Sequence, residues 1–383
     1  MHFRVKVLVR TARSADARQR ETCFRRWPVV SGQLGVNQDC ITFAGDLHAP
    51  EVFRSELPLS PPWVCNLEGP VTKAQAGTSG KINLKIEEFV LEESLGSLPA
   101  AVSLANNHIM DYGEAGLKDT LGVLQKRGIQ VFGLGRTGAR SERPARIKCA
   151  GLDVALLGYV CRSTNPAVGA ENSPSLMDDG LIEHDIQQAK LDGAARVVLC
   201  LHWGQEEVPL PTPQDRLKSI AYVRAGADLI VGHHSHCIQS WEVIDKTPVF
   251  YGLGNLVMPD RLRIPDSFDD AGHPQHWCEM RQHKWNRESL LVDWHPASRE
   301  WHVRTAVFRR GLLKGHGVAS KRRELRVPIG DEYARRHENS VRSSRWRAAC
   351  ADLLTRPRVP TRRGLIFALR TAPGRTDHQE GES

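Results

Sequence analysis

The sequence lacks any long hydrophobic run. Across 383 residues, no apolar stretch approaches the roughly 18–20 residues that a membrane-spanning helix needs. The first ten residues, MHFRVKVLVR, carry charges too often for the apolar region of a signal peptide. They could form a targeting-like helix, but we favour an upstream extension, with the true start near residue 38. We therefore expect a cytoplasmic protein without a transmembrane segment.

Closely paired cysteines are also lacking. The nine cysteines are odd in number and widely spaced, and no Cys-x-x-Cys pair occurs. Several lie inside apolar runs, as Cys200 does within residues 197–201. This pattern predicts reduced, buried thiols rather than a disulfide framework. We expect no cysteine to act as a metal ligand or nucleophile.

Acidic residues are scarce at both ends of the chain. Residues 1–37 hold eight Lys/Arg against two Asp/Glu, and residues 311–383 hold sixteen against eight. Residues 38–310 hold 28 against 34, so the net charge of +8 belongs to the flanks. We predict a disordered basic extension (1–37), a globular domain (38–310) and a basic, Arg-rich C-terminal tail (311–383). Such flanks are either solvated tails or contacts for nucleic acid, anionic lipid or an acidic polymer.

Strand-like and helix-like segments alternate from residue 40 onward. Apolar runs predict buried strands at residues 40–44, 63–67, 100–104, 129–132, 153–160, 197–201 and 228–231. Amphipathic patterns predict helices at residues 114–127, 181–192 and 213–225. Further strands are predicted at residues 241–244, 249–251, 290–294 and 301–308. Residues 259–287 have no clear period and are predicted to form a long surface insertion. The order indicates an α/β sandwich with mixed sheets.

Acidic and imidazole side chains follow the first two predicted strands. Asp46 and His48 stand two residues apart, so in an extended backbone they point to the same side and can share an ion. Glu68 follows the next strand, and a carboxylate there can bridge two cations. Taken singly, these residues are better explained as a capping Asp, a surface His and a solvated loop Glu.

The third group is Asn106-Asn107-His108, with Asp111 beyond it. An amide oxygen is a hard ligand for a divalent ion, and His108 could donate a proton or stabilise developing charge. Asp111 could hold that imidazole in one tautomer. The alternative is a turn and helix cap.

Histidines follow two later strands. His202 ends the run at residues 197–201, and His233-His234-Ser235-His236 follows the run at residues 228–231. A single His is more often a hydrogen-bonded core residue, but three within four residues is the most specific local signal in the chain.

The five groups follow five predicted strands, whose carboxyl ends converge at one edge of an α/β sheet. Carboxylate, amide and imidazole ligands without thiolate suit Mn, Fe, Zn or Mg. The set is larger than one ion needs, whereas two ions bridged by a carboxylate would use it fully. The sequence therefore predicts two divalent metal ions of unknown identity.

Longer strings resemble the CapA family (poly-γ-glutamate capsule synthesis) within the calcineurin-like metallophosphoesterase superfamily. They are NLEGP (66–70), SLANNHxxDYG (103–113), HWG (202–204), GADLIVGHHSH (226–236) and YGLGN (251–255). The resemblance runs from about residue 40 to 258, and extends at most to 310. It implies a four-layer α/β/β/α sandwich of the metallophosphoesterase type, with two mixed sheets.

The resemblance also implies roles for individual residues. Asp46, His48 and His236 would hold the first metal, and Asn107, His202 and His234 the second. Glu68 would bridge them, where the superfamily usually has Asp. His108, supported by Asp111, would act in catalysis. Asn106, His233 and Asn255 are expected to contact substrate.

Three functions are compatible with these residues. The first is a metal-dependent hydrolase of a small phosphoester or, less favoured, of an amide or isopeptide such as polyglutamate. The second is a non-catalytic polymer-binding or assembly protein of capsule synthesis. The third, a nuclease, lacks an aromatic platform for bases, so nucleic acid is not expected as a partner.

Overall fold

The computed structural model describes residues 39–135, 144–169, 172–269, 273–318, 324–325 and 327–355. The predicted N-terminal extension (1–37) and the last 28 residues of the predicted C-terminal tail (356–383) lie outside these ranges. No helix in the described ranges is both long and apolar enough to cross a membrane. The seven cysteines whose state the structure describes are free thiols.

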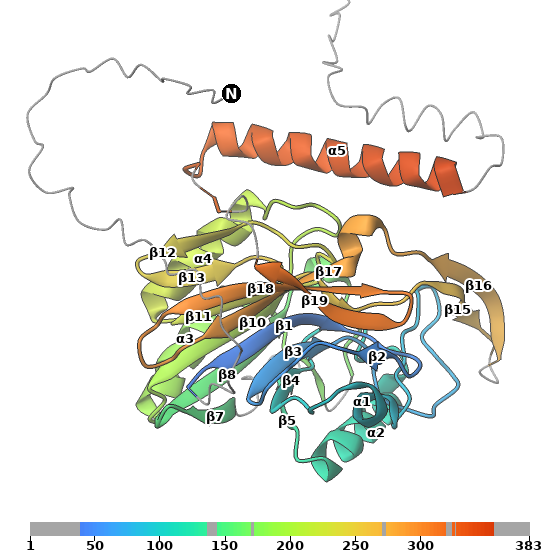
Figure 1. Ribbon diagram of the computed structural model, residues 1–383, viewed down its shortest axis with the longest axis horizontal. Helices are drawn as coiled ribbons and strands as arrows, with labels where there is room; N and C mark the ends of the chain where they lie inside the picture. Colours follow the sequence, from blue (N-terminus) through green and yellow to red (C-terminus); the bar gives the residue numbers. More distant parts are fainter. Residues whose placement is uncertain are drawn as a thin grey trace, which may run out of the picture. The chain divides into compact units, whose positions relative to one another are not determined.

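The larger sheet has nine strands and mixed directions (Figure 1). Four strands run parallel to one another: β1 (Ile41–Leu47), β3 (Trp63–Leu67), β4 (Ala101–Ser103) and β5 (Gln130–Phe132). On the other side of β1 follow antiparallel β17 (Glu288–Trp294), β18 (Trp301–Arg309) and β19 (Leu312–Val318). Two short strands complete it, β2 (Arg54–Ser55) next to β19 and β14 (Asn255–Val257) next to β1.

The second sheet has six strands. Its parallel members are β8 (Leu152–Val160), β10 (Arg196–His202), β11 (Leu229–His233) and β13 (Thr247–Phe250). Antiparallel β7 (Ala145–Cys149) and β12 (Trp241–Ile244) form its two edges. Nearly continuous apolar runs in β8 and β10 fit strands that are buried on both faces.

Three apolar clusters hold these elements together. One joins the two sheets face to face, with Phe43 and Val64 from the first packed among residues such as Leu156 and Val231 from the second. A second packs α1 (Val90–Ser94) and α2 (Gly113–Lys126) on the larger sheet. The third packs α3 (Asp179–Leu191) and α4 (Pro213–Ala225) on the smaller sheet. The mixed α/β class predicted from the sequence is confirmed.

Local signals explain why α4 starts and stops where the sequence predicts. The Thr212 side chain accepts from the Asp215 N–H, and the Asp215 side chain accepts from the Thr212 N–H. This capping box is worth about 1 kcal/mol, and Pro213 suits the first turn. Gly226 then ends the helix with a φ of 116°, a conformation that a side chain would disfavour.

Several elements were not expected from the sequence. The predicted insertion at 259–287 contains a two-stranded sheet, β15 (Arg261–Phe268) with β16 (Pro274–Met280), followed by the short helix η2 (Lys284–Arg287). A second small sheet joins β6 (Leu134–Gly135) to β9 (Ser173–Pro174), and η1 (Arg162–Thr164) follows β8. The domain boundary predicted at 310 falls inside the β18–β19 hairpin, and α5 (Asp331–Thr355) follows.

Candidate metal centre

Strand register places four of the predicted positions side by side. Asp46, near the end of β1, pairs with Asn66 on β3 and with Asn255 on β14. In the second sheet, His202 at the end of β10 pairs with His233 at the end of β11. The carboxyl ends of parallel strands from both sheets therefore contribute to one site.

Asp46 connects the two sheets. It is fully buried, and its Oδ1 lies 2.9 Å from Nδ1 of His233. The side chain of Asn66 donates to Oδ1 at 2.9 Å, and the backbone N–H of His234 donates to Oδ2 at 3.2 Å. These bonds fix the direction of the carboxylate toward the second sheet.

Two glycines let the backbones approach closely beside these ligands. A Cβ on Gly45 would lie 1.9 Å from the carbonyl oxygen of Gly254. A Cβ on Gly232 would lie 1.8 Å from the carbonyl oxygen of Tyr251. Each glycine directly precedes a site residue, so the absence of a side chain is needed for the strand ends to meet.

Glu68 and His236 complete a compact acid and imidazole group with Asp46. One oxygen of Glu68 lies 3.8 Å from Nε2 of His236, whose Nδ1 lies 3.8 Å from Asp46 Oδ2. One candidate ligand atom from each of the three residues lies within 4.8 Å of the others. This spacing fits a single cation between them.

The residues predicted for the second ion also lie together. Nε2 of His202 is 2.8 Å from Oδ1 of Asn107 and 4.0 Å from Oε1 of Glu68. The rings of His202 and His234 have centroids 4.9 Å apart, and those of His234 and His236 are 6.0 Å apart. Glu68 therefore lies between the two sets, as a bridging carboxylate would.

Glu206 belongs to the cluster but was not expected from the sequence. It is exposed, and it forms a second compact group with His234 and His236 within 4.8 Å. The available signal was its position four residues after His202, in the loop that leaves the same strand end.

His108 directly follows Asn107 and is only partly buried. Its Nδ1 is 2.7 Å from Oδ2 of Asp111, as predicted, and its side chain is 12% exposed. The other oxygen of Asp111 is 2.7 Å from Nζ of Lys81, which also donates to the carbonyl of Asn107. Nothing in the sequence pattern pointed to Lys81, because it comes from a loop without periodicity.

The three residues expected to contact substrate are buried and bonded to other residues of the site, and their contact with substrate stays a prediction. The amide of Asn106 donates to Asn66 and to the carbonyl of Leu67, and its oxygen accepts from the N–H of His108. Asn255 Oδ1 lies 2.9 Å from Nδ1 of His236, and His233 is bonded to Asp46. These contacts orient Asp46, His108 and His236 within the candidate site.

His48 follows β1 directly, and its side chain is fully buried. Its backbone N–H donates to the carbonyl of Val257 at 2.9 Å. Neither compact group includes His48. Its assignment as a ligand stays a prediction.

Burial and neighbouring charges set the protonation of the cluster. Burial raises the pKa of Glu68 above its usual range and lowers the pKa of His234 to about 4. Burial and four neighbouring imidazoles, His108 among them, lower the pKa of His202 well below normal. Burial opposes the charge on His236, but Glu68, Glu206 and Asp46 together raise its pKa to about 9. The lowered pKa values keep His202 and His234 in the neutral form that binds metal, whereas His236 would have to lose its proton when a cation binds.

Unpartnered buried atoms test whether these residues fit a metal. Among the described residues, both carboxylate oxygens of Glu68 lack a hydrogen-bond donor, although the residue is fully buried. Nδ1 of His202 and Nδ1 of His234 are also buried without a hydrogen-bond partner. A buried, unsatisfied carboxylate is costly, and a cation would compensate it. The donor set therefore fits divalent ions.

The backbone is strained at the same place. His234 has a φ of 82° and His236 a φ of 52°, in the left-handed region that favours glycine. Each such residue costs on the order of 1–3 kcal/mol, and this kind of strain collects at ligand sites.

Comparison with known proteins agrees with the resemblance seen in the sequence. The model of the family "Bacterial capsule synthesis protein PGA_cap" matches residues 53–260. The chain is 34% identical over 235 residues to the PGA biosynthesis protein CapA of Bacillus subtilis (strain 168), covering 60% of this chain and 56% of that protein. It is 32% identical over 201 residues to the capsule biosynthesis protein CapA of Bacillus anthracis, covering 50% and 49%.

These matches cover only part of each relative. The chain spans about half the length of the curated relatives it matches. A solved structure, the NAD nucleotidase of Haemophilus influenzae, aligns with a TM-score of 0.36 and 13% identity, over 79% of this chain and 59% of that one. The fold assignment rests on the sheets described above and not on that alignment.

The matched segment holds Glu68, Asn107, His202, His234 and His236, whereas Asp46 and His48 precede it. It covers more than half of the 383 residues, so the family predicted from the sequence is confirmed. The chain belongs to the family of the bacterial capsule synthesis protein PGA_cap.

Proposed function

We propose that this protein is a divalent-metal-dependent hydrolase, phosphoesterase-like in its chemistry, that acts in the synthesis of an acidic capsule-type polymer. The observation that carries the proposal is Glu68, a fully buried carboxylate without a hydrogen-bond donor, set between two groups of imidazoles. The names of the relatives, which refer to PGA and capsule biosynthesis, supply the pathway part of the proposal.

The ligand assignment follows the two groups of side chains. Asp46, His48 and His236 would hold one ion, Asn107, His202 and His234 the other, and Glu68 would bridge them. Glu206 is close enough to His234 and His236 to add a ligand or to face the substrate. When bound, such a pair would polarise an ester oxygen and favour attack by water.

Proton donation and contact with an anionic substrate would fall to His108 and Lys81. His108 keeps Nδ1 on Asp111, so Nε2 is the nitrogen that can give a proton to a leaving oxygen. Lys81 neutralises the other oxygen of Asp111 and places a positive charge near an anionic substrate. The buried Asn106 holds the backbone of His108 and keeps this arrangement in place.

The test combines metal analysis with turnover of bis(p-nitrophenyl) phosphate. We expect the purified protein to bind Mn²⁺ or Zn²⁺ and to hydrolyse this diester when loaded. The double variant His234→Ala, His236→Ala is expected to lose both properties. His273→Ala is the matched control, since His273 is an exposed histidine on the β15–β16 hairpin and belongs to neither compact group of candidate ligands. Turnover that survives in the double variant would refute the hydrolase.

A second function, non-catalytic binding of the polymer, is favoured by a basic groove described below. In that case the metal would serve structure alone. Binding of polyglutamate by a protein that holds metal but hydrolyses no ester or amide in a substrate screen would favour this second function over the first.

A further inference from the structure

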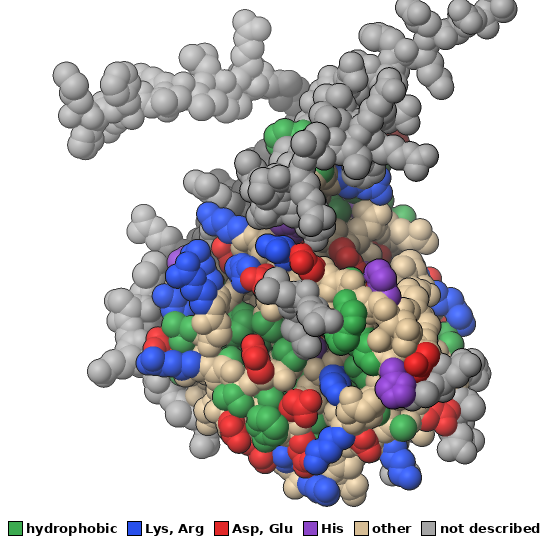
Figure 2. Space-filling model, turned by 90° about the vertical axis from the view of Figure 1, so that its right-hand side faces the viewer, with side chains coloured by type: hydrophobic (Ala, Val, Ile, Leu, Met, Phe, Trp, Pro, Cys, Tyr) green, Lys and Arg blue, Asp and Glu red, His purple; other side chains and the backbone are tan. Residues whose placement is uncertain are grey.

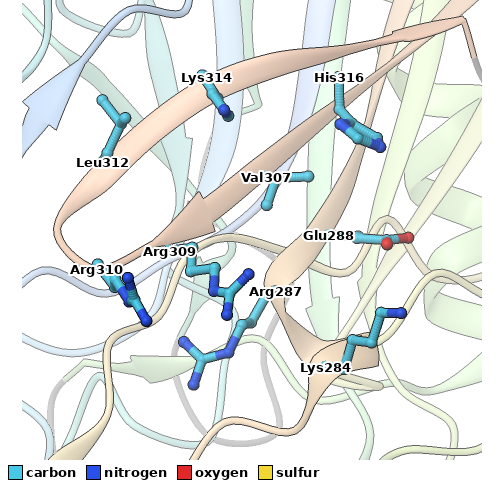
Figure 3. Close-up of a pocket in the computed structure, with 9 residues that line it drawn as sticks. All are labelled: Lys284, Arg287, Glu288, Val307, Arg309, Arg310, Leu312, Lys314 and His316. Carbon is cyan, nitrogen blue, oxygen red and sulfur yellow. The ribbon is translucent and has the colours of Figure 1, made fainter.

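A groove of about 1000 Å³ lies beside η2 and strands β17, β18 and β19 (Figure 3). Five of the nine residues that line it are Lys or Arg, one is His and one is Glu. Its basic members, which we call the basic groove, are Lys284, Arg287, Arg309, Arg310, Lys314 and His316. Figure 3 shows Arg287 and Arg309 at one end, with Lys314 and His316 along the opposite strand.

Strand register explains why these side chains gather. Val307 pairs with Glu288 on one side and with Lys314 on the other, so the three point to the same face of the sheet. Further along β17, the same face carries Leu290 and Val292, which are buried against the second sheet. At the groove this face carries charged, solvent-accessible side chains instead.

The charge of the groove is only partly neutralised. Arg287 is paired with Asp260 at 2.7 Å. Within the described part of the chain, Lys284, Arg309 and Arg310 have no ion pair, and the same holds for Lys314. Elsewhere, as Figure 2 shows for one face of the molecule, acidic and basic side chains are interspersed. Glu288 is the one acidic residue of the lining, so the cations outnumber it, and such an excess of positive charge in one hollow attracts a multiply charged anion.

The groove is linked to the candidate metal centre through η2. Asn255 holds His236 with its oxygen and donates to the carbonyl of Asn286 at 2.9 Å. The side chain of Asn286 donates to Glu207, which directly follows Glu206. The next residue, Arg287, lines the groove. The two sites therefore share one short, hydrogen-bonded segment.

We propose that the basic groove binds a chain with repeated carboxylates, of the polyglutamate type. This rests on the acidic-polymer part of the proposed function and not on hydrolysis. Several cations in a row fit an extended chain that offers charges at regular intervals better than a single small anion. The apolar side chains Val307 and Leu312 would pack against the methylene groups of such a chain.

The experiment uses the full-length protein and a fluorescein-labelled, γ-linked decamer of glutamate, followed by anisotropy at low salt. The test variant is Arg309→Glu, Arg310→Glu, with Lys314→Glu as a second, milder variant. The charge-matched control is Lys118→Glu, Arg224→Glu, two exposed residues on α2 and α4. Circular dichroism melts check that every variant is folded.

We expect the test variant to weaken binding about tenfold or more, and Lys314→Glu to weaken it less, because each exposed ionic contact contributes modestly. The control double variant should bind as the unaltered protein does, and raising the salt concentration should weaken binding in both. Equal affinity of all variants would overturn the groove as the site. A single-stranded oligonucleotide of equal charge that displaces the decamer at lower concentration would overturn the polycarboxylate assignment.

A further arm separates this inference from the hydrolase. The His234→Ala, His236→Ala variant should bind the decamer normally, even though it loses turnover. Loss of decamer binding in that variant would contradict the groove, whereas absence of turnover in every variant would contradict only the hydrolase.

Discussion

Two charged clusters in the same fold, one partly and one fully buried, are built in opposite ways. In the first, Arg216 forms two bonds to Glu242, at 2.8 and 2.6 Å, and donates to the carbonyl of Val327. Tyr251 donates to the same Glu242, and Arg216 lies 4.3 Å from the ring centroid of Tyr333 on α5. In the candidate metal centre, by contrast, Glu68 is more deeply buried and has no donor among the described residues.

The difference separates a cluster that stabilises the fold from one whose composition suits a cation. The hydrogen-bonded pair of Arg216 and Glu242 holds α4, β12 and α5 together. A buried carboxylate among imidazoles, without donors, destabilises the fold unless something else compensates it.

The largest effect on stability is expected at the pair of Arg216 and Glu242. Arg216→Ala would leave the charge of Glu242 without its partner, and should lower the free energy of unfolding by about 2–3 kcal/mol, because the pair is only partly buried. Chemical denaturation measures this. Among the described residues, the pair makes no hydrogen bond to the candidate metal centre. The protein that remains folded should therefore keep its divalent metal. Loss of metal from the folded variant would mean that the pair of Arg216 and Glu242 also supports the metal centre.

The next effect is on metal affinity. His236→Ala removes a residue shared by both compact groups, so affinity for Mn²⁺ should fall by about 100-fold or more. Calorimetric titration of protein stripped with a chelator measures it. His273→Ala, on the exposed hairpin, should leave the affinity unchanged.

A smaller effect is expected at a residue that only orients a ligand. Asn255→Ala removes the contact to Nδ1 of His236 and should weaken metal binding about tenfold. Asn255→Asp, which keeps an acceptor at the same place, should restore most of the affinity. If Asn255→Ala were as damaging as His236→Ala, Asn255 would itself be a ligand.

The smallest effect concerns an exposed carboxylate and its pH dependence. Burial opposes the charge of Asp179, but bonds from Tyr222 and Lys218 lower its pKa below normal. A lowered pKa in the folded state gives stability that is present above the unfolded value, near 3.9, and is lost as the pH falls. Asp179→Asn should therefore cost less than about 1 kcal/mol at pH 7, and this cost should shrink as the pH falls below about 4, measured by thermal melts. A cost that grows toward low pH would have the wrong sign.

Much of the fold could be predicted from the sequence, because its parallel strands are apolar and end in marked polar motifs. The run at 197–201 and the helix at 213–225 carry their own boundary signals, His202 and the Thr212 capping box. The strand β19 and helix α5 were missed because charged residues interrupt their apolar period. The hairpin of β15 and β16 was missed because its strands are largely exposed.

The candidate site was predicted by residue type and position, and the structure adds what spacing cannot show. The histidines and carboxylates of five strand ends come together because the two sheets pack face to face, which brings Asp46 of one sheet against His233 of the other. Glu206 and Lys81 lie in loops, where no periodicity points to the side that a residue faces. The burial of Asn106 and Asn255 depends on neighbours from distant parts of the chain.

The most direct test of the metal centre is native mass spectrometry of the protein after loading with Mn²⁺ or Zn²⁺ and removal of free ions. We predict a mass increase of two divalent ions for the unaltered chain, and fewer ions for Glu68→Gln, which keeps the shape of the bridging residue but not its charge. An unaltered chain that retains no ion while remaining folded would contradict the account.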